Sequence, residues 1–158
     1  MKEAFGGTFL MYLLMIAIVI FVTFLAETLK YVQAFRVKNT IINYIEQYGG
    51  FTDYVKDTLL EDNATGYLKK VGYKGALPAG DDYIDSIPKI ANAGKDSTYC
   101  SKNYGYCVIL ESCDGKVAYY RVVTNMTLNF TEVIGASGIQ IGVPGETRYV
   151  VVPEGFCH

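Results

Sequence analysis

Tryptophan is absent from this chain, and histidine occurs once, as the last residue, His158. Nucleophilic catalysis needs a base beside the nucleophile, and one terminal histidine does not supply it. No CxxC pair occurs, and the 14 basic residues form no block against the 16 acidic ones. A zinc site and a nucleic-acid interface both lack their usual signals. We therefore expect no enzyme activity, no metal or other cofactor, and no nucleic-acid partner.

Charge, proline and glycine are all missing from the run Thr8–Ala26, which is almost wholly apolar. About nineteen residues at 1.5 Å per residue span close to the ~30 Å hydrocarbon layer of a bilayer. The alternative is a cleaved secretory signal peptide, but its apolar part is usually shorter and ends at a small-residue site. The sequence predicts a transmembrane helix within residues 1–26 and a second unit over residues 27–158.

The helix is expected to continue beyond the membrane to about Tyr48, where Gly49-Gly50 would stop it. Apolar residues recur at helical spacing and predict the face that packs on a domain: Leu29, Val32, Phe35, Ile42, Ile45 and Tyr48. The polar residues lie mostly on the other face: Lys30, Gln33, Arg36, Lys38, Asn39, Asn43 and Glu46. The prediction is one rod of roughly forty residues, about 60 Å long.

The four cysteines all lie behind the membrane segment and favour two disulfides in an oxidising compartment. If Cys107 to Cys113 is one strand, these two lie about 20 Å apart and cannot bond to each other. Two pairings remain: Cys100–Cys107 with Cys113–Cys157, which we favour for its smaller loop, or Cys100–Cys113 with Cys107–Cys157. By the positive-inside rule, however, Lys30, Arg36 and Lys38 would keep this side in the cytoplasm. We give the cysteines more weight and predict a C-terminal domain outside the cytoplasm.

Beyond the long helix, Phe51–Glu61 predicts a short helix with one apolar face: Phe51, Tyr54, Val55, Thr58 and Leu59. The stretch Gly72–Thr98 is rich in Gly, Pro, Asp and Asn and predicts a long loop, with one helical turn near Tyr83–Ile87. Asp81, Asp82 and Asp85 within it are oxygen ligands of the kind that calcium uses. They lack the alternation of an EF-hand loop, so a solvated acidic loop is the favoured interpretation.

A sheet is expected to begin near Tyr104, because a strand-like run meets Asp114-Gly115, a strong hairpin signal. In the returning strand, Tyr120, Val122, Met126, Leu128 and Phe130 alternate with polar residues, which predicts one buried face. One or two further strands follow around Pro144-Gly145. The predicted fold is therefore α+β: a long helix, a short helix and a three- to four-stranded antiparallel sheet. The outer half of the long helix should cover the sheet's apolar face.

Fourteen tyrosines are present, and Tyr119 and Tyr120 are adjacent in the predicted returning strand. Neighbours in a strand point to opposite faces, so at least one of the two should face outward or lie at a contact. Tyrosines on that side could present an aromatic surface to a partner or a glycan. The favoured alternative is that tyrosine simply replaces other aromatic residues in a half-buried sheet.

A membrane helix that extends into a disulfide-closed antiparallel sheet resembles the type IV pilin superfamily. The layout is most similar to the minor pseudopilins of tight-adherence (Tad) systems and to pilin-like proteins near Gram-positive secretion or conjugation machinery. The resemblance implies a prepilin-peptidase site at Gly6-Gly7, cut after Gly7 to leave Thr8 first. The fifth position after that cut is Tyr12, where the family usually has Glu, and the span holds no acidic residue.

The resemblance implies a structural or assembly subunit of a surface filament, secretion or conjugation machine. Its helix would contact the membrane and like or related pilin subunits, in a homo-oligomer or filament, through positions such as Tyr12, Ile16, Ile20 and Glu27. It would be a single-pass membrane protein or part of an extracellular filament. The alternative is a monomeric, membrane-tethered binding module that recognises a ligand through Gly72–Thr98.

Overall fold

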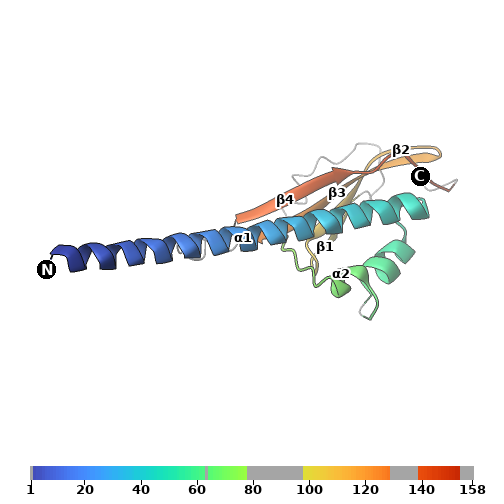
Figure 1. Cartoon of the computed structure of the whole chain (residues 1–158). Helices are drawn as coiled ribbons and strands as arrows, with labels where there is room; N and C mark the ends of the chain where they lie inside the picture. Colours follow the sequence, from blue (N-terminus) through green and yellow to red (C-terminus); the bar gives the residue numbers. More distant parts are fainter. Residues whose placement is uncertain (1, 63, 78–97, 129–138, 154–158) are drawn as a thin grey trace.

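A computed structural model describes residues 2–62, 64–77, 98–128 and 139–153, with only the backbone of residues 2–6. One long helix is followed by two short helices and a small antiparallel sheet (Figure 1), the predicted α+β arrangement with one short helix more than expected. The helices are α1 (Lys2–Tyr48), η1 (Tyr54–Leu60) and α2 (Tyr67–Lys70). The strands are β1 (Thr98–Ser101), β2 (Tyr106–Asp114), β3 (Val117–Leu128), β4 (Ile139–Glu146) and β5 (Val150–Val151).

Helix α1 runs without a break for 47 residues and ends where the sequence predicted. Gly49 adopts a left-handed conformation with φ of 70°, which an L side chain would resist. The Gly50 N–H then donates to the Ile45 carbonyl at 2.9 Å, which satisfies one of the free carbonyl groups at the helix end. The sheet lies along the second half of α1, while the first half stands clear of every other element (Figure 1).

The strand order is β1-β2-β3-β4, all antiparallel, with β5 pairing beside β4 on the same edge of β3. The predicted hairpin is present: Asp114 pairs with Val117, so Gly115 and Lys116 form the turn. Gly115 has φ of 56°, the conformation that glycine supplies at the first central position of a type II′ turn. The sheet thus has five strands in place of the three to four expected.

Two strand boundaries differ from the prediction. Thr98, expected in the loop, opens β1, so the sheet begins before Tyr104. Pro144-Gly145, expected to separate two strands, lies inside β4, where Pro144 pairs with Val123 of β3. Because β4 is an edge strand, the missing N–H of proline breaks no inner ladder. The chain leaves β4 at Thr147 instead, whose N–H donates to the Tyr120 carbonyl and whose hydroxyl accepts from the Tyr120 N–H.

The core lies between α1 and the sheet, but the packed face of α1 differs from the predicted one. Of the six predicted core residues on α1, Ile45 is fully buried, while Leu29 is 72% exposed. The fully buried side chains of α1 are Ala34, Val37, Ile41 and Ile45. Lys38, predicted on the polar face, is buried: its Nζ donates to the Pro144 carbonyl at 3.3 Å and lies 4.2 Å from the centre of the Phe35 ring. The long aliphatic stem of lysine allows this placement.

The short helix after α1 is present, but it has π-helical geometry, with the Glu61 N–H bonded to the Lys56 carbonyl five residues earlier. Of the predicted apolar face, Val55 is fully buried and Phe51 and Leu59 pack against the core, whereas Tyr54 and Thr58 are exposed. Leu60, which was not predicted there, is buried. The second short helix, α2, was not predicted; it buries Leu68. In β3 the predicted buried residues Tyr120, Val122 and Met126 face the core, but Asn125, predicted on the polar face, is also buried, so the alternation does not hold there. Phe130, predicted on the same buried face, lies outside the described residues.

Candidate functional site: an uncovered apolar helix joined to the domain

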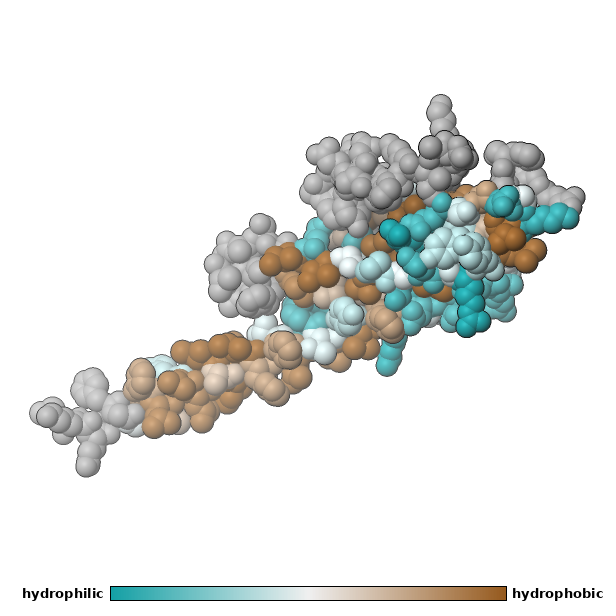
Figure 2. Space-filling view, turned by 90° about the horizontal axis from the view of Figure 1, so that it is seen from above, coloured by the Kyte–Doolittle hydropathy of each residue, from teal (hydrophilic) through white to brown (hydrophobic). Residues whose placement is uncertain are grey.

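The first half of α1 is an apolar surface with nothing packed on it. Figure 2 shows this half as a continuous hydrophobic rod that projects from the mixed surface of the domain. The helix is long and apolar enough to cross a membrane. Its most apolar 18-residue stretch has a mean hydropathy of 2.8, and none of that stretch is buried in the domain. Tyr12, Ile16 and Ile20 are all exposed on it. They are therefore placed where lipid or a neighbouring helix would contact them.

Polar side chains near the end of this rod are satisfied within the helix itself. The Thr23 hydroxyl donates to the Val19 carbonyl at 2.8 Å, and the Thr28 hydroxyl donates to the Phe24 carbonyl at 2.9 Å. A hydroxyl that bonds its own helix adds little cost in a medium without water. The Thr23 hydroxyl, which lies inside the run Thr8–Ala26, is thus satisfied in a lipid environment.

The predicted processing residues lie within α1 and not in an extended segment before it. Gly6 and Gly7 are helical, and Thr8 is exposed. A Cβ added to Gly7 would meet nothing within 4 Å, so no packing contact requires glycine there. Each glycine destabilises a helix interior by about 1 kcal/mol relative to alanine. The pair therefore marks the point in the first turns of α1 where local unwinding costs least.

Glu27 lies where the rod meets the domain. Its Oε1 accepts from Lys30 Nζ at 3.1 Å, and both side chains are partly covered. Its Oε2 is buried and has no hydrogen-bond partner among the described residues. Glu27 is thus the first charged group after the span, and it is neutralised by its own helix.

The disulfides agree with the favoured pairing as far as the structure describes it. Cys100 of β1 and Cys107 of β2 are bonded, directly opposite each other in the sheet register. This excludes the alternative in which Cys100 pairs with Cys113. Cys113, at the other end of β2, is also disulfide-bonded. Cys157 lies outside the described residues, so its bond to Cys113 stays a prediction.

A buried tyrosine–carboxylate cluster ties η1 to the sheet, and the sequence analysis missed it. Tyr106 and Tyr99 both donate their hydroxyls to Oε1 of Glu61, at 2.6 and 2.9 Å. Burial, with the bond to Glu61 second, raises the pKa of Tyr99 to about 12 and raises the pKa of Tyr106 further. A single glutamate at the end of a short helix carries no sequence signal for this role. The cluster holds η1 and the sheet together.

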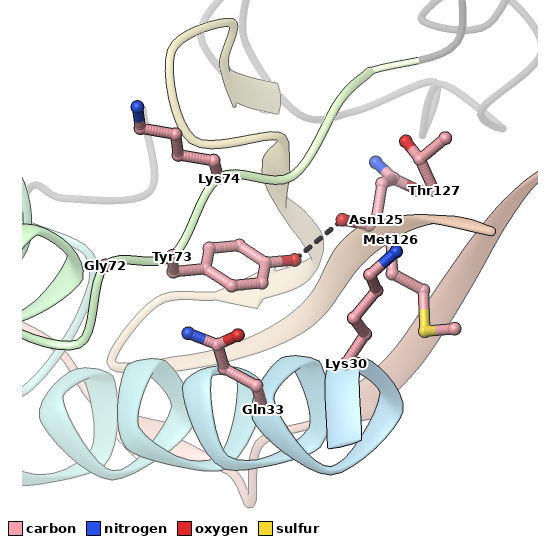
Figure 3. Close-up of a pocket in the computed structure, with 8 residues that line it drawn as sticks. All are labelled: Lys30, Gln33, Gly72, Tyr73, Lys74, Asn125, Met126 and Thr127. Carbon is pink, nitrogen blue, oxygen red and sulfur yellow. Dashed lines mark hydrogen bonds between the residues drawn. The ribbon is translucent and has the colours of Figure 1, made fainter. Parts of the chain in front are cut away.

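Two of the cavities beside the helices contain polar side chains. One of about 380 Å³ lies between α1, the segment after α2 and the end of β3, and Figure 3 shows Lys30 and Gln33 rising into it from α1. Tyr73 crosses it and donates its hydroxyl to the Asn125 carbonyl at 2.7 Å. The other, of about 370 Å³, is lined by Asp57, Glu61 and Asp62. No group of three metal-binding side chains occurs in the described parts of the chain.

The two adjacent tyrosines of β3 point to opposite faces, as predicted. Tyr120 is buried in the core, whereas Tyr119 lies on the outer face. The Tyr119 ring lies 5.5 Å from that of Tyr149, which is 74% exposed, and its hydroxyl donates to Glu146. The outer face of the sheet thus holds a fixed aromatic pair.

Several predicted features fall outside the described residues: the acidic triplet Asp81, Asp82 and Asp85, the turn near Tyr83–Ile87, and His158. The described residues therefore place the apolar helix, one disulfide and the sheet surface. No protein-family model, curated protein or solved structure matches the chain.

Proposed function

We propose that this chain is a pilin-like structural or assembly subunit of a bacterial surface filament, secretion or conjugation machine, anchored by its N-terminal helix. One observation carries the proposal: a single unbroken helix serves as an uncovered apolar rod over its first half and as the spine of a folded domain over its second. Such a rod can bury its surface only in lipid or against other helices.

The geometry of the junction supports an assembly role. Helix α1 continues through Glu27 into the domain with no proline, and its buried residues from Ala34 to Ile45 fix the domain to the rod. Contacts made by the rod therefore set the position of the domain directly. When the apolar helices of several subunits associate, their domains would therefore take fixed positions around the bundle of helices.

The second candidate is a monomeric, membrane-tethered binding module. It is favoured by the cavity beside Tyr73 and Lys74, which the start of the predicted Gly72–Thr98 loop helps to line. A ligand of this module would enter that cavity. This candidate requires the membrane helix only as a tether, and it predicts no cleavage at Gly7.

The mature N-terminus separates the two candidates. We expect Edman sequencing and intact-mass measurement of the protein from its native membrane to give Thr8 as the first residue. The Gly7→Val variant should remain uncleaved, because the bulky side chain blocks the peptidase site. Ala17→Val adds comparable bulk at an exposed position inside the span and serves as the matched control, which should be cleaved normally.

Recovery in sheared surface fractions tests assembly itself. The wild-type chain and the Ala17→Val control are expected there together with related subunits, or cross-linked to them in the membrane. An intact N-terminus on a protein that stays monomeric in detergent at all concentrations would contradict the assembly proposal and favour the tethered module.

A further inference from the structure

Large exposed apolar side chains gather at the membrane-proximal end of the domain, beyond the predicted span. On α1 the exposed residues are Leu29, Tyr31, Val32 and Phe35, and on β4 they are Ile139 and Ile141. Leu29 is 72% exposed and Ile139 is 51% exposed. We call these six residues the apolar collar. In a water-facing domain such a collection marks a surface that contacts something apolar.

The height of β4 relative to α1 can be worked out from contacts farther along both elements. Lys38 Nζ bonds the Pro144 carbonyl, and a Cβ on Gly145 would meet the Lys38 stem. The Arg148 N–H donates to Glu46 Oε1. From the first contact to the second, α1 rises about 12 Å and the strand side rises a similar distance, so the two elements run nearly parallel away from the membrane.

Counting back along β4 places its first residue at the end of the span. Ile139 precedes Pro144 by about 16 Å of strand, at ~3.3 Å per residue. The same distance back along α1 from Lys38 is about eleven residues, which reaches Glu27. By the same count Ile141 is level with Tyr31. The start of β4 therefore lies at the height where the uncharged run ends.

This height coincides with the lipid headgroup layer. The bilayer is ~40–45 Å thick with a ~30 Å hydrocarbon core, which leaves about 5–8 Å on each side. Leu29 lies about 4–5 Å beyond Ala26 along the helix, inside this layer. Phe35 lies about 13 Å beyond Ala26, above this layer, and forms the upper limit of the collar. Tyrosine, here Tyr31, is enriched at this level of membrane proteins.

The distribution of the collar around the helix favours lipid over a single protein partner. Leu29 and Val32 line a groove with Tyr67 and Val71 on the α2 side of α1. Phe35 lies under Lys38 on the β4 side. Successive helix residues turn by about 100°, so Tyr31 points away from Leu29. One partner covers one side, whereas a bilayer surrounds the helix on all sides.

We propose that the lower part of the apolar collar, Leu29, Tyr31, Ile139 and Ile141, lies in the headgroup layer of the bilayer, so that the base of the domain rests in the membrane surface and is not held above it. The proposal rests on membrane insertion of α1 and does not depend on filament assembly. Its consequence is that lipid contacts β4 as well as α1.

The absence of tryptophan makes the test direct, because one introduced tryptophan is the only such fluorophore in the chain. The full-length protein is reconstituted at low density in liposomes with lipids brominated just below the headgroup. Three variants are compared: Ile139→Trp in the collar, Phe21→Trp in the span, and Val151→Trp at the distal end, where the side chain is 73% exposed. Ile141→Trp replaces the first variant if that one fails to form the Cys100–Cys107 disulfide.

We expect bromolipid to quench the emission of Ile139→Trp and Phe21→Trp several-fold more than that of Val151→Trp, while soluble acrylamide does the reverse. If Phe21→Trp is quenched and Ile139→Trp behaves like Val151→Trp, the collar lies in water and this proposal is wrong, although the anchor stands. The Ile139→Trp emission could instead be blue-shifted, unquenched by bromolipid and dependent on protein density. That result would identify a second copy of the chain as the partner of the collar, and it would also overturn this proposal. Failure to quench Phe21→Trp would reject membrane insertion itself.

Discussion

At the scale of single residues, Glu61 is the polar group on which the contact between η1 and the sheet depends most. One carboxylate oxygen accepts from two tyrosines that come from neighbouring strands. Tyr106 is fully buried, so its hydroxyl has no water to replace a lost acceptor. A buried donor without a partner costs about 1–3 kcal/mol.

We expect Glu61→Ala to lower the free energy of unfolding by about 1–3 kcal/mol, because it removes the acceptor of two tyrosine hydroxyls. Glu61→Gln keeps an acceptor oxygen at the same distance from the backbone and should lower the free energy of unfolding clearly less. Urea unfolding of the detergent-solubilised protein, followed by far-UV circular dichroism, measures both. Equal losses in the two variants would show that the carboxylate contributes through its charge and not through hydrogen bonding.

The same cluster predicts a loss of stability at alkaline pH. Burial and Glu61 raise the pKa of Tyr99 to about 12 in the folded protein, above the ordinary value of about 10. A raised pKa means that the fold favours the protonated tyrosine, so this stabilisation is complete below pH ~10 and is lost as pH rises toward 12. We expect the free energy of unfolding to fall over this interval. Tyr99→Phe removes the titrating group and should make the fall shallower.

Two left-handed glycines allow backbone strain to be separated from close packing. Gly115 and Gly105 have similar φ values, 56° and 64°. A Cβ on Gly115 would enter open space, whereas one on Gly105 would come within 2.3 Å of the Gly75 backbone. Gly115→Ala should cost about 1 kcal/mol from strain alone. Gly105→Ala should cost more, and thermal unfolding of the two variants gives the difference; equal costs would show that the Gly75 segment moves away freely.

At the scale of elements, the length and end of α1 could be predicted from the sequence, but the face that it buries could not. Its existence, length and end were predictable, because an uncharged run, a breaker-free continuation and Gly49-Gly50 each have a local cause. The buried face was not. Apolar side chains occur around most of the helix between Leu29 and Ile45, and the choice between faces is made by the sheet. Lys38 adds to the error, because its stem packs like an apolar residue.

We expect Ile41→Ala to lower the free energy of unfolding by about 2–5 kcal/mol, since the side chain is fully buried and leaves a cavity. Leu29→Ala, on the predicted but unpacked face, should change it by less than about 0.5 kcal/mol. Urea unfolding in detergent measures both. A large loss from Leu29→Ala would mean that the predicted face is packed after all.

The strands of the sheet were predictable where a turn signal and an alternating pattern occur together in the sequence. They were not predictable where a strand forms only because it pairs with a distant segment. Asp114-Gly115 and the alternation of β3 fixed the central hairpin. Thr98–Ser101 is short and follows a loop-like sequence, and it becomes a strand because Cys100 lies opposite Cys107. Pro144 suggested a turn, but an edge strand tolerates proline. The Glu61 cluster joins segments about forty residues apart, which no local pattern could reveal.

At the scale of the whole molecule, the uncovered apolar half of α1 and the folded domain have separate sources of stability. None of the best apolar window of α1 is buried in the domain. We expect a chain lacking residues 1–26 to keep its free energy of unfolding within about 0.5 kcal/mol of the full-length protein in detergent. Urea unfolding checks this. A large drop would show that the span contributes to folding of the domain.

The charges that opposed the predicted orientation are largely engaged by the fold. Lys30 pairs with Glu27, and Lys38 bonds the Pro144 carbonyl beneath the domain surface. The positive-inside rule, however, counts Lys and Arg near the end of a span and gives acidic partners little weight, so these contacts do not remove the three charges from the count. The orientation therefore stays a prediction that depends on the cysteines.

The unbroken passage of α1 from its uncovered apolar half into the domain makes the protein a stiff lever. About 33 Å of helix extends from Glu27 to Tyr48, so a 10° change of helix tilt would displace the far end by about 6 Å. No flexible joint absorbs this motion, since the helix ends only at Gly49. A change of helix tilt at the apolar end of α1 would therefore become a displacement of several ångströms at the far end of the domain, near Tyr149 and Val151.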